Sequence, residues 1–124
     1  LCKAEIENNL NGPAAALPYL NQIRARAGAP EYGKHNRFPA PSTKEAMNDA
    51  ILKERGYELV FEFQRRADLI RFGKYEEVVN AHLKKLGIAQ PTNVTSSLRY
   101  FPYPLNDAQL NPNLAAENPS RLPK

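Results

Sequence analysis

The chain has 124 residues, of which 42% are hydrophobic and 24% charged, so it has the size and apolar content of one folded domain and not of a disordered chain. Its formal net charge of +4 comes from scattered basic residues, and the absence of any nucleic-acid motif argues against a nucleic-acid partner. The single cysteine, Cys2, excludes an internal disulfide and a cysteine-based zinc site, and no apolar run has the length of a membrane span.

The first part of the sequence predicts a helical hairpin followed by a long loop. Residues 3–10 have helical character, and Asn11-Gly12-Pro13 should end one helix and begin the next, because glycine accepts a left-handed backbone and proline suits a first helical turn. The second helix should present Ala16, Leu20, Ile23 and Ala27 on one face. Arg24 and Arg26 should point elsewhere, and Pro18 should bend or delay the helix. Residues 28–42 show no periodicity and predict a loop.

A single long helix is predicted from about Thr43 to Phe72. Ser42 and Glu45 form a plausible capping box at its start, and no proline interrupts the chain from there to residue 90. Gly73 should break this helix, and the apolar spacing in YEEVVNAHLKKLG predicts a shorter amphipathic helix after it.

Charged side chains fall within the apolar sector of the predicted long helix. Arg55, Glu62 and Arg66 project there, and Glu62 is spaced to meet a guanidinium on either side, so we expect a buried structural ion-pair network. The alternative is that the acids of this helix, Glu54, Glu58, Glu62 and Asp68, include the acid and base of a glycosidase. Because each acid has an arginine within about one turn, the structural network is the favoured interpretation.

The chain beyond residue 90 is rich in proline and predicts a different kind of structure. A β-prone stretch lies around residues 98–103, and Asn106 with Gln109 should cap a single helical turn. The remainder should lie extended along the helical body. His35 and His82 have no second ligand at metal spacing, so no metal and no cofactor is expected.

Three segments, in this order, are similar to the C-terminal part of the SusD/RagB family: AEIENNLNGPAAALPYLNQIRARAG, AILKERGYELVFEFQRRADLIRFGKY and YFPYPLNDAQLNPNLAAENP. The middle segment resembles the signature ER..EL.FE..R..DL.R through Glu54, Arg55, Glu58, Leu59, Phe61, Glu62, Arg65, Asp68, Leu69 and Arg71. The last resembles the ending P.P..EL..NP.L.QNP through Pro102, Pro104, Leu110, Asn111, Pro112, Leu114, Asn118 and Pro119.

The resemblance implies a mainly α protein with a tetratricopeptide-like helical hairpin, a long central helix and an irregular, proline-rich C-terminal tail. Residues 1–90 would form the SusD-like helical region, and residues 91–124 a tail packed on it. Such lipoproteins stand at the extracellular face of a Bacteroidetes outer membrane, where they bind oligosaccharides, or peptides in the RagB branch. They deliver the ligand to a SusC-like TonB-dependent transporter and are not enzymes.

Two departures from the family pattern lie in the signature. Arg66 and Ala67 stand where an aromatic pair is common, and Phe63 replaces a usual glycine, so the local packing should differ. The lipid-bearing cysteine of the family belongs at the mature N-terminus. Cys2 follows Leu1 in a helical context, so we expect the anchor to lie upstream and to be absent from this chain.

Aromatic residues of the loops are the candidate ligand contacts, since flat aromatic faces bind sugar rings. They are Tyr32, Phe38, Tyr100, Phe101 and Tyr103. The alternative, that they pin the loops to the helices, is favoured because aromatic side chains mostly serve packing. A nutrient-binding protein is thus the first functional hypothesis; a helical-repeat adaptor that grips a protein partner is the second, and a glycosidase the third.

Overall fold

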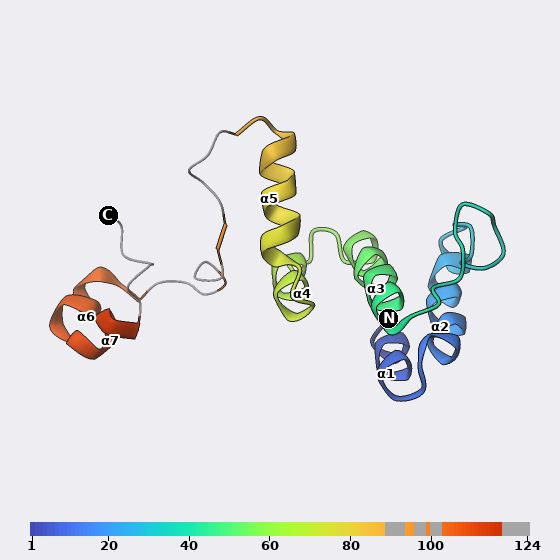
Figure 1. The fold of residues 1–124 in the computed structure, drawn as a ribbon, viewed down its shortest axis with the longest axis horizontal. Coiled ribbons are helices and arrows are strands. Elements are labelled where there is room, and N and C mark those ends of the chain that lie inside the picture. The colour runs from blue at the N-terminus through green and yellow to red at the C-terminus, as the bar shows by residue number, and fades with distance from the viewer. Residues whose placement is uncertain (89–93, 96–98, 100–102, 118–124) are drawn as a thin grey trace. The chain divides into compact units, whose positions relative to one another are not determined.

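The computed structural model describes residues 1–88, 94, 95, 99 and 103–117. This described part of the chain forms helices and no β-strand, which confirms the mainly α expectation. The helices are α1 (Cys2–Asn11), α2 (Pro13–Arg26), α3 (Lys44–Glu58), α4 (Arg65–Arg71), α5 (Tyr75–Lys85), α6 (Leu105–Leu110) and α7 (Pro112–Glu117) (Figure 1). The chain divides into two compact units, Leu1–Phe72 and Gly73–Lys124.

Helices α1 and α2 form the predicted hairpin. Gly12 joins them with a φ of 88°, a backbone conformation that glycine adopts without steric cost, and Pro13 occupies the first turn of α2. The expectation that Pro18 delays the second helix is wrong, because α2 already begins at Pro13 and runs through Pro18. Inside the helix, this proline lacks the N–H that would have donated to the previous turn, and its ring crowds the carbonyl four residues earlier.

The core of the first unit lies between α1, α2 and α3, which pack against one another. Its buried apolar residues are Ala4, Ala16, Leu20, Tyr32, Met47, Ala50 and Ile51. Small alanines on α1 and α2 let the two helices approach closely, while Leu20, Met47 and Ile51 fill the space between them and α3. The buried amide of Asn8 donates to the Lys44 carbonyl at 2.9 Å and to Asn48 Oδ1 at 2.8 Å, which ties α1 to the start of α3.

The predicted single helix from Thr43 to Phe72 is wrong. Helix α3 ends at Glu58, and α4 begins at Arg65, with the turn 59–64 between them. Within this turn Phe61 and Phe63 have φ values of 68° and 58°, so the backbone leaves the helical region at two residues. Helical spacing continues on both sides of the turn, and no proline or glycine marks it, which is why the pattern could not reveal the break.

The first turn of α3 differs from the expected capping box by one residue. Thr43, and not Ser42, is the N-cap, and its hydroxyl accepts a hydrogen bond from the Ala46 N–H at 3.1 Å. Glu45 lies in the first turn, where a carboxylate interacts favourably with the helix dipole.

The second unit contains α5, which confirms the predicted shorter helix, although none of its residues is buried. The Asn80 side chain exchanges two hydrogen bonds with the backbone of Val94, and both Arg99 Nε and Nη2 donate to the Glu76 carboxylate. The hydrogen bond from Arg99 is the main reason why the pKa of Glu76 lies below its usual value.

The C-terminal region corrects two expectations. Asn106 lies inside α6 and does not cap it, because the helix begins one residue earlier, at Leu105. Helix α7 stands where an extended chain was expected. Of the β-prone stretch 98–103, the structure describes only Arg99 and Tyr103. The packing of residues 91–124 on the helical body stays a prediction. No helix in the described part of the chain has the length and apolarity to cross a bilayer.

Candidate functional site

The loop that joins α2 to α3 and residues 46–53 of α3 line an open cavity of about 530 Å³. Tyr32, Phe38 and the prolines at 39 and 41 form its apolar wall, and Arg37 and Lys53 bring cationic groups to it. This volume falls within the range of about 300–1,000 Å³ that is typical of small-molecule sites, which combine an apolar lining with a few polar groups. The cavity therefore has the size and chemistry of a binding site for a small ligand.

A buried arginine holds the aromatic wall in place. Arg24 of α2 is only 4% exposed, and its guanidinium carbon lies 4.6 Å from the ring centroid of Tyr32 and 4.5 Å from that of Phe38. The same side chain donates from Nε to the Pro30 carbonyl at 2.5 Å and forms an ion pair with Glu54 of α3. One guanidinium thus contacts two rings, the loop backbone and a carboxylate. These contacts fix α2, the loop and α3 together.

A second anchor lies beside it. The Asn21 amide donates to the Tyr32 carbonyl at 2.9 Å, and the Tyr32 N–H donates to Asn21 Oδ1 at 2.8 Å. The Tyr32 ring meets the Phe38 ring edge to face, with centroids 5.9 Å apart. Burial, followed by the charge of Glu54, raises the pKa of the Tyr32 phenol, so the ring stays neutral over the physiological pH range.

Two of the five predicted ligand contacts line this cavity. Tyr32 is buried and Phe38 half-buried, so both also pack on the core, as the alternative interpretation held. Tyr103 is exposed and belongs to the second unit, and Tyr100 and Phe101 lie outside the described residues. Whether any of the five contacts a ligand stays a prediction.

Sequence reasoning missed the role of Arg24 and wrongly pointed its side chain away from the core. A usable signal existed, because Ala16, Leu20 and Arg24 follow one another at intervals of four and so continue a single buried stripe along α2. Arginine was taken for a surface residue, although a paired arginine can be buried.

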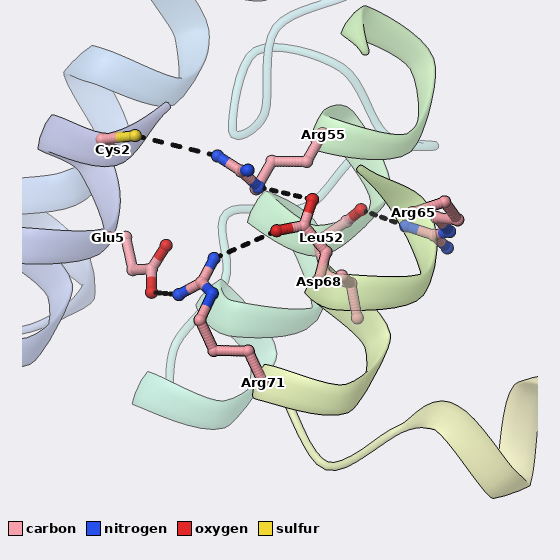
Figure 2. Close-up of polar contacts among 7 residues, drawn as sticks. All are labelled: Cys2, Glu5, Leu52, Arg55, Arg65, Asp68 and Arg71. Carbon is pink, nitrogen blue, oxygen red and sulfur yellow. Dashed lines mark hydrogen bonds and ion pairs between the residues drawn. The ribbon is translucent and has the colours of Figure 1, made fainter. Parts of the chain in front are cut away.

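A network of ion pairs joins α1, α3 and α4 (Figure 2). Arg55 Nε donates to Asp68 Oδ2 at 2.8 Å, and Arg71 forms ion pairs with both Asp68 and Glu5. Burial disfavours the charged form of Asp68, but the hydrogen bonds from Arg55 and Arg71 outweigh it, and the pKa of this carboxyl lies below its usual value. The network therefore keeps Asp68 ionised and holds α4 against α3.

Arg65 adds a contact at the same junction. Its Nη1 donates to the carbonyl of Leu52 at 2.7 Å (Figure 2). A Cβ at Gly56 would lie 2.9 Å from this Nη1, so the glycine leaves room for the guanidinium to cross α3. This close approach gives Gly56 a physical reason to lack a side chain.

The predicted ion-pair network of Arg55, Glu62 and Arg66 is wrong in its central acid. Glu62 lies exposed in the turn 59–64, and Arg55 pairs with Asp68 instead. The wheel analysis placed Glu62 in the apolar sector because it assumed an unbroken helix, and the turn rotates this residue out of that sector.

Carboxylates of α3 and α4 are engaged by arginines. Glu54 pairs with Arg24, Glu58 with Arg26, and Asp68 with Arg55 and Arg71. In the part of the chain that the structure describes, no three His, Cys, Asp or Glu side chains gather to hold a metal ion, and His35 and His82 are exposed. These ion pairs join helices, and Arg24 also contacts the aromatic wall of the cavity.

Comparison with known proteins matches the chain to the SusD family over residues 1–120. SusD-like protein P25 of Formosa agariphila is 38% identical over 112 residues, which cover 90% of this chain and 20% of that protein. SusD-like protein P38 of the same organism is 37% identical over 81 residues, which cover 64% of this chain and 16% of that protein. The chain thus spans about a fifth or less of the length of these relatives, and no solved structure matches it significantly. The chain belongs to the SusD family.

Proposed function

We propose that this chain is the C-terminal segment of a nutrient-binding protein that captures an oligosaccharide at the cell surface. The ligand is held without covalent chemistry and is delivered to a SusC-like TonB-dependent transporter at the extracellular face of the outer membrane. Membership of the SusD family supports the class, and no residue of the chain is assigned a catalytic role.

The cavity behind the loop 27–43 is the observation that carries the binding proposal. Apolar contact between a sugar ring and an aromatic side chain needs a ring that is held still, since an ordered side chain loses less entropy on binding. Phe38 meets this requirement, because Arg24 and Tyr32 fix it from two directions. The polar groups of Arg37, Asp49 and Lys53 at the same cavity can hydrogen-bond sugar hydroxyls.

The test uses the intact protein as its gene encodes it, applied to a printed array of oligosaccharides and peptides. Phe38→Leu keeps apolar bulk but removes the flat ring, and we expect it to weaken saccharide binding at least fivefold. Phe61→Leu is the matched control, because Phe61 is an exposed ring remote from the cavity lining, and it should leave binding unchanged.

Two results would contradict the proposal. If only peptides bound, the ligand would be a peptide and not an oligosaccharide. If the two leucine variants had equal effects on binding, the cavity would not be the binding site. Copurification of a TonB-dependent barrel with the intact protein from detergent-solubilised outer membranes tests the transporter partnership separately. Recovery of a soluble partner without the barrel would favour a helical-repeat adaptor instead.

A further inference from the structure

Two cations at the cavity differ from several other cations of this unit in their pairing with acids. Arg37, from the loop, and Lys53, from α3, both line the cavity and are exposed. No carboxylate among the described residues forms an ion pair with either of them. Other cations of this unit do form ion pairs with carboxylates: Arg24, Arg26, Lys34, Arg55 and Arg71.

The charge balance of the cavity is positive. Asp49 is the acid of its lining, and this residue has an interaction of its own. Arg37 and Lys53 bring two positive charges to the same space, against one negative charge. Because both cations are exposed, their attraction to an anionic ligand is that of charges at a solvated surface, which salt weakens.

The chemistry of the two groups suits an anionic oxygen group. A guanidinium presents a planar fork that matches two oxygens of a carboxylate or a sulfate ester, and an ammonium adds a compact charge that is free to rotate. Phe38 and the prolines of the loop supply an apolar surface beside these groups, so one cavity offers contact to both a ring and its acidic substituent.

We propose that the cavity selects an acidic saccharide, whose carboxylate or sulfate ester is held by Arg37 and Lys53 while its sugar ring lies against Phe38. This inference rests on the proposed function, because it names the class of saccharide that the same site binds. Neutral saccharides lack the negative charge that the two cations attract, so they bind more weakly.

The experiment measures affinities of the intact protein for matched oligosaccharides by isothermal titration calorimetry. One arm compares a galacturonic acid trisaccharide with its methyl ester, and a second compares galactotriose with and without a sulfate ester. The two arms distinguish a carboxylate from a sulfate as the bound group. The variants are Arg37→Gln, Lys53→Gln and the double variant, with Lys85→Gln of α5 as a control that removes an exposed lysine from the other unit.

We expect an acidic member to bind about tenfold more tightly than its neutral counterpart. Each single variant should weaken acidic binding about threefold, within the worth of one exposed ion pair, and should weaken neutral binding less. The double variant should abolish the preference, and Lys85→Gln should keep it. Raising the salt concentration from about 20 mM to about 500 mM should also reduce the preference, because salt screens exposed charges.

Equal affinity for acidic and neutral members, or a preference that survives in the double variant, would overturn this inference and leave the proposed function intact. Failure to bind any saccharide, on this panel and on the array, would overturn the proposed function together with the inference. Circular dichroism of each variant shows that the fold is retained, as expected for substitutions of exposed residues.

Discussion

Two connecting segments of the first unit, the loop 27–43 and the turn 59–64, each carry two aromatic residues. These residues are packed in the loop and exposed in the turn. In the loop, Tyr32 is 9% exposed and Phe38 is packed against the core. In the turn, Phe61 and Phe63 are 90% and 96% exposed and hold positive φ angles. Aromatic content is therefore the same in both segments, while burial differs almost completely.

Polar anchors explain this difference. The loop is held by the Arg24 guanidinium and by the Asn21 amide, both of which are buried and reach backbone groups of the loop. The turn is anchored only through the helices on either side of it. From α4, Arg65 donates to the Leu52 carbonyl of α3 and Asp68 accepts from Arg55, so these contacts fix only the ends of the turn. A loop thus packs on the core where a neighbouring helix supplies buried hydrogen-bond partners for the loop backbone. The aromatic side chains of the loop are then buried with it.

Among the tests of this comparison, removal of the Glu54 carboxylate should cause the largest loss of stability. Glu54→Ala leaves the buried Arg24 without its carboxylate, and we expect the free energy of unfolding to fall by roughly 3–5 kcal/mol. Urea denaturation followed by circular dichroism measures it. Glu58→Ala is the matched control, because it frees Arg26, which is 67% exposed, and should cost at most about 1 kcal/mol. Equal losses in the two variants would show that the loop does not depend on the buried pair.

The ion pairs of Asp68, which hold α4 against α3, should make stability depend on pH. Since the pKa of Asp68 is lowered in the folded chain, its stabilisation is present above the unfolded value of about 3.9 and is lost as pH falls through the folded pKa. Asp68→Asn should therefore reduce the free energy of unfolding by about 2 kcal/mol at pH 7, with a smaller difference below pH about 4.

Urea denaturation between pH 2 and pH 7 follows this effect. Glu62→Gln changes an exposed acid of the adjoining turn and should leave stability unchanged at every pH. An Asp68→Asn difference that stays constant down to the lowest pH would rule out the ionised carboxylate as its cause.

Loss of the Asn21 anchor should cost somewhat less. Asn21→Ala leaves the N–H and the carbonyl of Tyr32 without partners in a buried setting, and we expect a loss of roughly 2 kcal/mol in the free energy of unfolding. Amide hydrogen exchange should show loss of protection at Tyr32. Asn11→Ala removes an exposed amide that donates to the Glu7 carboxylate, and protection of the loop should then persist.

The smallest effect is expected at Phe63. Phe63→Gly should raise the free energy of unfolding by about 0.5–1 kcal/mol, because glycine adopts a φ of 58° without the steric cost that a side chain incurs. Phe63→Ala keeps the Cβ and should change stability little, so the pair separates backbone strain from loss of the ring. If alanine destabilised the intact protein as strongly as a core truncation would, the ring would be buried there and the comparison of the two segments would fail.

Much of the helical framework was predictable from local chemistry. The Asn11-Gly12-Pro13 turn, the apolar face of α2 at Ala16 and Leu20, and the extent of α5 all follow from capping and periodicity, which depend on neighbouring residues alone. The break between α3 and α4 was not predictable in this way, since the residues of the turn 59–64 are as compatible with a helix as their neighbours. The resemblance to the family held the better clue, because a usual glycine is replaced by Phe63 at one of the two residues with positive φ.

The cavity could be predicted only in part. Tyr32 and Phe38 were singled out as aromatic residues of a loop. The spacing along α2 could mark Arg24 as buried, but it could not identify the two rings and Glu54 as its partners. Arg55 was expected to pair with Glu62 of the same predicted helix, whereas its partner is Asp68, which lies in a different helix. Spacing along one helix cannot identify a partner that another element supplies.

The sequence by itself determined that the chain is helical, where its first hairpin turns, and to which family it is similar, because capping residues, apolar spacing and ordered motifs are local properties. Only the tertiary structure decided which charged residues are buried, which aromatic residues form a cavity wall and where the central helix breaks. Each of these depends on contacts between different elements, such as that of Arg24 with Glu54, 30 residues away, or of Arg65 with the Leu52 carbonyl, 13 residues away.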